Sequence, residues 1–177
     1  QRHFKNLKLI SPNSNFYAFR VRNNPLSEEF NEIVVINDLD KIKSLNMDLA
    51  IISSPPSVQQ NIISFVVENS INFFVEKPIG INYNVLSSLI PEVKSKNLIS
   101  MVGFNLRFHP LHSEIKKIIS SIDFGKVYSI RSMVGQYLPD WHPNEDYSKG
   151  YSANKHLGGG VLLDLTHEID FTYSLLG

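Results

Sequence analysis

The sequence predicts a doubly wound α/β fold, a parallel sheet covered by helices, followed by part of a second domain of α+β type. Two observations predict it. Almost continuous apolar runs alternate with helical stretches up to residue 105, and this rhythm then changes. Continuous apolar runs are typical of parallel strands that are buried on both faces. The expected strands are NFYAFRV (15–21), IVVI (33–36), DLAIISS (48–54), NFFVEK (72–77) and LISMVGFN (98–105).

Helical stretches separate these strands, as in an open sheet whose strands are joined by crossover helices. Pro55 and Pro56 mark the start of one helix, because the fixed φ of proline suits the first helical turn. Pro91 lies inside another helix and should kink it or split it in two. The expected helices are QRHFKNLK (1–8), DLDKIKSLN (38–46), VQQNIISFVVENS (58–70) and YNVLSSLIPEVKSK (83–96).

A second domain is expected after a boundary near residues 104–110, which divides the chain into domains 1–105 and 106–177. It should begin with a helix and continue as a longer strand, a polar loop or lid, and a closing helix. These elements are expected at residues 109–121, 126–138, 139–156 and 159–176. The apolar side chains of the closing helix should be core, namely Val161, Leu162, Leu163, Leu165 and Ile169.

Composition excludes several classes of protein. The 177 residues are 42% hydrophobic and 19% charged, with 17 basic and 17 acidic residues, so the sequence is that of a soluble globular protein without a strong pull toward nucleic acid or membrane. The absence of cysteine excludes disulfides and thiolate zinc sites and fits the cytoplasm. No apolar run approaches the roughly 20 residues of a membrane helix. The chain opens on Gln1, inside a helix, and both ends look truncated.

Two motifs end expected strands, where ligands bind in open α/β sheets. The first is SSPPS (53–57), a rigid corner whose plainer interpretation is a simple strand-to-helix turn. The second is Glu76-Lys77-Pro78. Pro78 restricts Lys77 to extended geometry and can support a cis bond. A lysine there could stabilise charge on a substrate oxygen, or it could be a surface lysine in a salt bridge.

A third motif, GGGVLLDLTHEID (158–170), opens the closing helix. Its three glycines would let the backbone come close to a ligand. Asp164 and His167 are three residues apart and should share a helix face, where His167 could act as a base oriented by Asp164. The alternatives are a core histidine paired with a cap-like aspartate, and a metal site with Asp170 as a further ligand. The metal ranks third, because no other ligand cluster is evident, and none is expected.

Taken in order, SSPPS, EKP, GFNLRFHP (103–110) and GGGVLLDLTHEID resemble the Gfo/Idh/MocA oxidoreductase family. The resemblance implies a Rossmann domain followed by a domain on an open antiparallel sheet. It implies hydride transfer between NAD or NADP and a hydroxyl or carbonyl carbon of a sugar or cyclitol. Residues 134–153 look like members that act in surface-polysaccharide sugar pathways. A non-catalytic nicotinamide-sensing regulator on the same fold is the alternative, and a purely structural α/β fragment is a third interpretation.

The family's site residues carry over onto matching positions. Lys77 would contact the nicotinamide ribose and the reacting oxygen. His167 would be the acid/base and Asp164 its substrate-side companion, so these three are the expected catalytic residues. The expected cofactor-binding residues are Arg20, Arg22, Ser54, Pro55, Glu76, Lys77, Asn105 and Arg107. The complete protein is expected to act on a small sugar-like molecule and to form a homo-oligomer.

The sequence departs from the family pattern in three places. No GxGxxG is present, so the first strand and its phosphate-binding turn are expected to be missing, and this polypeptide alone should be unstable or aggregating, and inactive. Gln59 stands where the family often has histidine, with little expected loss. The end of the expected strand 15–21 reads Arg20-Val21-Arg22-Asn23, without the acid that binds a ribose diol. Since arginine can pair with a 2′-phosphate, NADP is preferred over NAD as a hypothesis.

Overall fold

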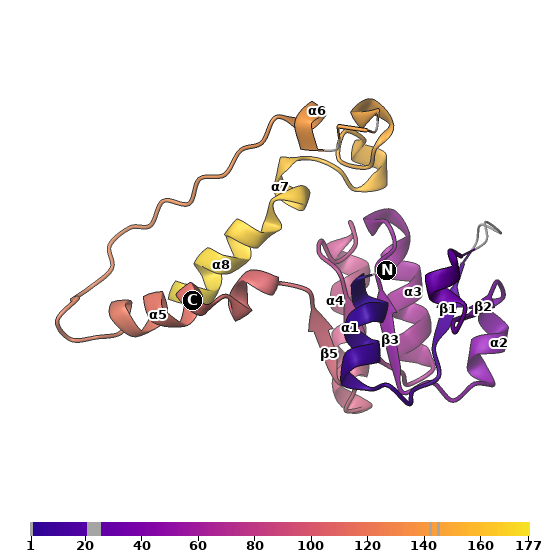
Figure 1. The fold of residues 1–177 in the computed structure, drawn as a ribbon. Coiled ribbons are helices and arrows are strands. Elements are labelled where there is room, and N and C mark those ends of the chain that lie inside the picture. Colours follow the sequence, from indigo (N-terminus) through magenta and orange to yellow (C-terminus); the bar gives the residue numbers. More distant parts are fainter. Residues whose placement is uncertain (1, 21–25, 142, 145) are drawn as a thin grey trace. The chain divides into compact units, whose positions relative to one another are not determined.

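The computed structural model describes residues 2–20, 26–141, 143–144 and 146–177 (Figure 1). The chain forms two compact units, Gln1–Ile51 and Ile52–Gly177. This division differs from the boundary expected near residues 104–110, which stays a prediction. Parallel strands and helices alternate through the first hundred residues, so the expected Rossmann-type α/β class is confirmed.

The first unit is built around a parallel pair of short strands. It contains α1 (Arg2–Ile10), β1 (Tyr17–Phe19), a 3-10 turn (Glu28–Phe30), β2 (Val34–Ile36) and α2 (Leu39–Lys43), and β3 (Leu49–Ile52) starts in it. Tyr17 pairs with Val34 and Phe19 with Ile36. Phe4 of α1 packs edge-to-face on Phe16 and Phe30, with ring centroids 5.0 and 5.6 Å apart. This aromatic cluster anchors α1, whose other residues are half-buried or exposed.

The second unit holds the end of β3 and two further strands, in the sheet order β3-β4-β5. Asn72–Val75 form β4 and Ser100–Val102 form β5, which run parallel. The connecting helices are α3 (Pro56–Glu68) and α4 (Tyr83–Ser95). The buried side chains of this core are Ile52, Ile63, Val66, Val67, Ile71, Phe73 and Val75. Its strands are short, and each ends in a turn that carries predicted site residues.

The helix with Pro91, expected to be kinked or split in two, is continuous, so of these two expectations the split is wrong and the kink stays a prediction. Proline removes one backbone donor from the helix. Pro91 is exposed, and the helix is capped at its start by the Asn82 side chain, which accepts from the amides of Asn84 and Val85 at 3.0 and 3.4 Å. The hydrogen bonds of the remaining turns therefore keep the helix continuous although one backbone bond is lost.

Residues 105–119 begin the second part of this unit. Asn105–Phe108 form a 3-10 turn and Pro110–Ile119 form α5. This helix packs against the last helix of the chain, α8 (Thr166–Leu176), as Figure 1 shows. His112 joins the two, with Nε2 2.8 Å from the Ser174 hydroxyl and its ring 5.4 Å from that of Phe171. The buried histidine thus has a structural role.

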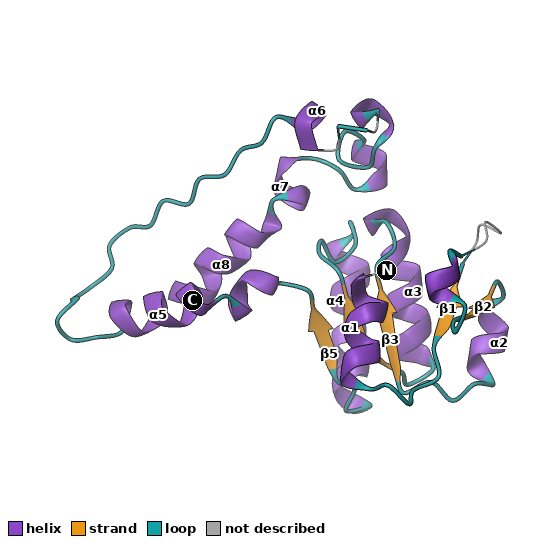
Figure 2. Cartoon of the chain, in the orientation of Figure 1, coloured by secondary structure: helices purple, strands orange, loops and turns teal. Residues whose placement is uncertain are grey.

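The strand expected at 126–138 is not formed. Residues 126–137 are a loop in Figure 2, followed by α6 (Leu138–Trp141) and two 3-10 turns, Tyr147–Lys149 and Lys155–Leu157. A strand needs a neighbour for its backbone groups. No segment of the described chain pairs with 126–137, so alternation in the sequence is not enough to make a strand.

The expected closing helix is divided. Val161–Asp164 form α7, and Leu165 separates it from α8 with φ −102° and ψ 31°. The expected core role is wrong for Val161, Leu162 and Ile169, whose exposed fractions are 74%, 73% and 55%. Because α7 is a single helical turn of four residues, its apolar side chains do not form a long helix face that could pack on a neighbouring element.

Candidate active site

The turn after β3 is rigid and presents a hydroxyl group. Pro55 is the N-cap of α3 with φ −56°, and Pro56 takes the first helical position, as its fixed ring geometry favours. The Ser54 Oγ atom is buried and has no hydrogen-bond partner. This turn is where the sequence placed cofactor contacts through Ser54 and Pro55.

The turn after β4 carries Glu76 and Lys77. The Glu76 amide donates to the Ile52 carbonyl at 2.8 Å, and the Lys77–Pro78 bond is cis. The Glu76 carboxyl lies against Gly103 at the end of β5, where an added Cβ would be 3.1 Å from Oε2 and 2.9 Å from the Phe74 ring. Glycine at 103 thus leaves room for the carboxyl group beside the strand end.

Gln59 joins the two turns. Its Nε2 donates to the Ser54 carbonyl at 3.0 Å and to the Glu76 carbonyl at 3.2 Å, and its Oε1 accepts from the Gly80 amide at 2.9 Å. From the sequence, little effect was expected of glutamine at this position. A signal existed, because Gln59 falls on the helix face of Ile63, where a polar residue interrupts an apolar stripe.

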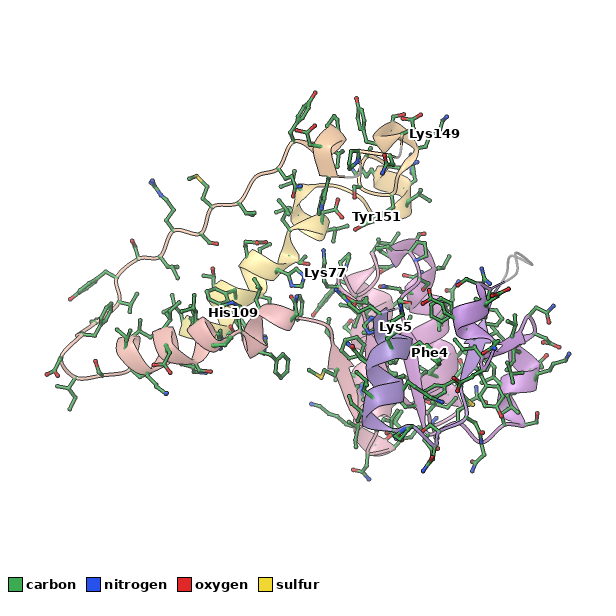
Figure 3. The ribbon with its side chains drawn as sticks, viewed as in Figure 1. Phe4, Lys5, Lys77, His109, Lys149 and Tyr151 are labelled. Carbon is green, nitrogen blue, oxygen red and sulfur yellow. The ribbon has the colours of Figure 1, made fainter. Side chains whose placement is uncertain are left out.

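The Lys77 ammonium reaches the break between α7 and α8. Lys77 is labelled in Figure 3. Its Nζ donates to the Asp164 carbonyl at 2.7 Å. In a continuous helix this carbonyl would accept from the amide of Glu168, four residues on. Here the Glu168 amide points to the Leu165 carbonyl at 3.4 Å instead. The break therefore leaves the Asp164 carbonyl available to the lysine.

Asp164 is buried, with 4% of its surface exposed. Its Oδ1 has no hydrogen-bond partner. Burial, together with hydrogen bonding and charge from Asp164, raises the pKa of the Tyr151 hydroxyl, so this hydroxyl stays protonated beside the carboxyl group. Tyr151 lies in the loop that the sequence identified as functional, but nothing in the sequence distinguished it from the other aromatic residues there.

The glycine run brings its own backbone close to the protein rather than to a ligand at two of its three positions. Gly158 has φ 93°, and a Cβ there would lie 2.7 Å from Pro56 and 2.8 Å from Ile81. A Cβ at Gly159 would overlap the Tyr151 carbonyl oxygen. Gly160, with φ 119°, has open space around it. The run thus docks the α7 segment next to the turn after β3.

His167 lies at the start of α8, half-buried, with its ring edge-to-face on Phe104 at 6.1 Å. Burial, and then the positive charge of Lys77, lower the pKa of His167 below the ordinary 6.5, while Glu168 and two further acids oppose this. The imidazole is therefore neutral near pH 7. Its Nδ1 has no hydrogen-bond partner, so it does not bond the unpartnered Asp164 Oδ1. The helix break separates the two residues that were expected to share a face.

Arg107 is held by Asp170. Its Nε and Nη2 donate to the two carboxyl oxygens at 2.8 and 2.6 Å, and this pairing raises the pKa of Arg107. The pair ties the 3-10 turn to α8, one turn beyond His167. Asn105 is exposed on the same 3-10 turn, and its amide donates to the Gly103 carbonyl at 3.0 Å. The predicted cofactor contacts of Asn105 and Arg107 stay predictions.

The first unit holds the other predicted cofactor residues. Arg20 directly follows β1, and its amide donates to the Ile36 carbonyl at 2.9 Å. Arg22 lies outside the described residues. The interpretation of this pair as a 2′-phosphate site therefore stays on the sequence alone.

Three buried polar atoms without partners belong to predicted site residues, namely Ser54 Oγ, Asp164 Oδ1 and His167 Nδ1. Buried polar groups normally have a partner, so these atoms fit a polar ligand such as a nicotinamide cofactor with its substrate. Within the ranges described, no three histidine or acidic side chains gather as metal ligands would. The helices described are also too short or too polar to cross a bilayer.

Residues 1–104 match the model of the GFO_IDH_MocA oxidoreductase family, NAD-binding Rossmann fold. The chain belongs to the Gfo/Idh/MocA oxidoreductase family. The match covers β1 to β5 and both strand-end turns, which confirms the resemblance carried by SSPPS and EKP.

Family relatives extend beyond the matched region. Myo-inositol 2-dehydrogenase of Thermotoga maritima is 24% identical over 180 residues, 99% of this chain and 51% of the relative. Levoglucosan dehydrogenase of Pseudarthrobacter phenanthrenivorans is 30% identical over 128 residues, 71% of this chain and 32% of the relative. The structure of myo-inositol 2-dehydrogenase from Lactobacillus plantarum has a TM-score of 0.70 and 23% identity, over 90% of this chain and 48% of that one. The chain spans about a third to a half of their length.

Proposed function

We propose that the complete protein is an NAD(P)-dependent dehydrogenase or reductase that acts on a hydroxyl or carbonyl carbon of a sugar or cyclitol. The observation that carries the proposal is the meeting of Lys77 with the α7–α8 break, where its ammonium bonds the Asp164 carbonyl at 2.7 Å. Burial, and then the charge of this ammonium, lower the pKa of His167. A cation, a neutral base and a buried carboxyl group are thereby brought together. Two of their buried atoms, Asp164 Oδ1 and His167 Nδ1, have no hydrogen-bond partner among the described residues.

The residues divide the chemistry between them. In the oxidative direction the neutral imidazole of His167 takes the proton of the substrate hydroxyl, leaving a carbonyl group. A nicotinamide held by the strand-end turns would supply the acceptor for the hydride of the same carbon. Lys77 donates to the reacting oxygen and stabilises its negative charge, and Asp164 Oδ1 accepts from a neighbouring substrate hydroxyl. The reductive direction reverses each transfer.

The cofactor would be held by the two strand-end turns. We propose contacts from Ser54, Pro55 and Glu76, with Asn105 and Arg107 beside the nicotinamide. Arg20 and Arg22 favour NADP over NAD, because the sequence has no acid there to bind a ribose diol. Titration of the complete protein with both cofactors checks this. Much tighter binding of NAD than of NADP would refute the preference.

The substrate class rests on the relatives. Their names describe dehydrogenases of inositol and levoglucosan, a cyclitol and a sugar derivative. A surface-polysaccharide sugar is the finer proposal, and it depends on the resemblance of residues 134–153 alone. The cytoplasmic setting and the homo-oligomer expected from the sequence remain part of the proposal.

The test is His167→Ala in the complete protein, with His156→Ala, an exposed histidine outside the site, as its control. Loss of a general base should lower kcat by about 10²- to 10⁴-fold. Cofactor affinity should change little, because His167 is proposed to act on the substrate. A variant with the kcat of the parent would overturn the assignment.

The same experiment addresses the nicotinamide-sensing regulator. If the protein is such a regulator, both variants would bind cofactor as tightly as the parent does. None of the three proteins would show turnover with any sugar or cyclitol. That result would exclude the dehydrogenase and leave the fold and the family unchanged.

A further inference from the structure

We propose that Gln59 is a positioning residue for Lys77. Its buried amide fixes the turn that carries the lysine. Gln59 is 1% exposed and makes three hydrogen bonds to backbone atoms. Two of these partners, the Glu76 carbonyl and the Gly80 amide, flank the Lys77–Pro78 pair. The third, the Ser54 carbonyl, ties that pair to the turn after β3.

The hydrogen-bond inventory of the side chain supports this role. A glutamine amide has two donor hydrogens and one acceptor oxygen. Both donors and the oxygen are used, and every partner lies in one of the two strand-end turns. A buried amide without partners would be destabilising, so the bonds explain why a polar side chain is tolerated on the core face of α3.

Lys77 is then held at both ends. Gln59 fixes its backbone through the neighbouring residues, and the Asp164 carbonyl binds its ammonium at 2.7 Å. A lysine side chain has four carbons and much rotational freedom, so the direction of its ammonium depends on where its backbone starts. Release of the turn should therefore free the ammonium even though Gln59 never touches it.

The first experiment measures the reactivity of Lys77 in the complete protein, without cofactor or substrate. Acetic anhydride labels lysines, and mass spectrometry gives the rate at each position. In Gln59→Leu the labelling rate of Lys77 should rise about tenfold, the equivalent of one lost hydrogen bond. Lys96 is the internal reference, because its ammonium also donates to backbone carbonyls, those of Val67 and Glu68 at 2.8 and 2.9 Å.

The matched control is Gln60→Leu. Gln60 is the next residue on α3, half-buried, with an Oε1 that makes no hydrogen bond. This variant makes the same chemical change beside the turn and should leave the labelling of Lys77 at the rate of the parent. An equal rise in both variants would show that any apolar substitution here loosens the turn, and it would overturn the specific role of Gln59.

A second variant, Gln59→Glu, keeps the shape of the side chain. An ionised carboxyl group faces the Ser54 and Glu76 carbonyls without a donor, whereas a protonated one regains a single donor. The ratio of Lys77 to Lys96 labelling should therefore rise with pH in Gln59→Glu and stay level in the parent. A level ratio in this variant, or failure of both Gln59 variants to fold, would place Gln59 in stability alone and overturn the proposal.

The activity arm rests on the proposed function. If the protein is a dehydrogenase, Gln59→Leu should lower kcat by roughly 10- to 100-fold, because a small displacement of a group at the reacting atom is costly. Faster labelling of Lys77 in a protein that shows no turnover would support the positioning role and reject the dehydrogenase. Unchanged labelling would reject the positioning role, whatever the turnover.

Discussion

The two sides of the candidate site differ in how completely their polar atoms are paired. On the strand side, the Lys77 turn is held by an amide whose donors and oxygen all have partners, above the buried side chains of Val75 and Ile63. On the helix side, Asp164 Oδ1 and His167 Nδ1 are buried without partners, and the apolar residues of α7 are exposed.

This difference separates preparation from recognition. Apart from the unpartnered Ser54 Oγ, the hydrogen bonds of the strand side described above are made within the protein. They hold the lysine-bearing turn and so present the lysine in a set direction, which is what electrostatic stabilisation of a reacting oxygen requires. On the helix side, Asp164 Oδ1 and His167 Nδ1 remain able to form further hydrogen bonds. A substrate hydroxyl can bond the atoms there that have no partner among the described residues, so binding would form hydrogen bonds that folding does not.

The largest expected effect comes from Gly159→Ala, which should disturb the packing of the helix side. An added Cβ would overlap the Tyr151 carbonyl oxygen and lie 2.6 Å from that of Ser152, and neither backbone atom can rotate away. The expected loss is about 3 kcal/mol in the free energy of unfolding, the upper end for overpacked sites. Denaturant unfolding of the complete protein measures it.

Gly135→Ala is the control, because a Cβ there would meet nothing within 4 Å. Its free energy of unfolding should match that of the parent. If Gly159→Ala were equally harmless, the helix side would be free to shift, and its unpartnered atoms would not define a fixed site.

A smaller effect is expected from Asp170→Asn, which weakens the link between the 3-10 turn and the helix of His167. The two-pronged pair with Arg107 is half-exposed on the arginine side, at 44%, and buried at 8% on the aspartate side. Loss of its charge should cost about 1–2 kcal/mol in the free energy of unfolding. Because His167 shares α8 with Asp170, kcat should fall as well.

Glu114→Gln tests a fully exposed ion pair of the neighbouring helix. Its carboxyl contacts Lys117 at 2.8 Å, with exposed fractions of 59% and 73%. Such surface pairs contribute less than about 0.5 kcal/mol in most helices. Equal losses in the two variants would mean that the Arg107 pair is an ordinary surface contact with no special part in placing α8.

The sequence predicted the strand side well because its signals are local. Continuous apolar runs identified all five strands, although each came out shorter, and the turns with Ser54 and Lys77 lie where the strands end. Gln59 interrupts the apolar stripe of α3 and so could be noticed in the sequence, but the stripe alone does not predict its role. Its partners come from positions 54, 76 and 80, and no spacing rule joins them before the sheet is formed.

The sequence pointed to Asp164 and His167, but the break between their helices could not be predicted, since tertiary contacts decide it. Three of residues 161–165 are leucine, a strong helix former, yet the helix ends at Asp164, where Lys77 binds the released carbonyl. The lysine lies 87 residues earlier in the sequence. The loop at 126–137 shows the same limit, because alternation describes a strand only when a neighbouring strand exists.

A small effect is also expected in the dependence of stability on pH through His167. Burial and Lys77 lower the pKa of His167 in the folded protein below the ordinary 6.5 of the unfolded chain. Between these two values the unfolded chain binds a proton that the folded protein does not, so stability falls as pH falls below 6.5 and is unaffected by this group above it. Unfolding of the complete protein at pH about 7.5 and about 5.5 should reveal a small loss of stability at the lower pH that disappears in His167→Asn. The exposed His156→Asn should keep that loss, because His156 is not buried beside a lysine. If both variants kept it, the acid sensitivity would belong to other groups, and the helix side would not hold its base in the neutral form that proton removal requires.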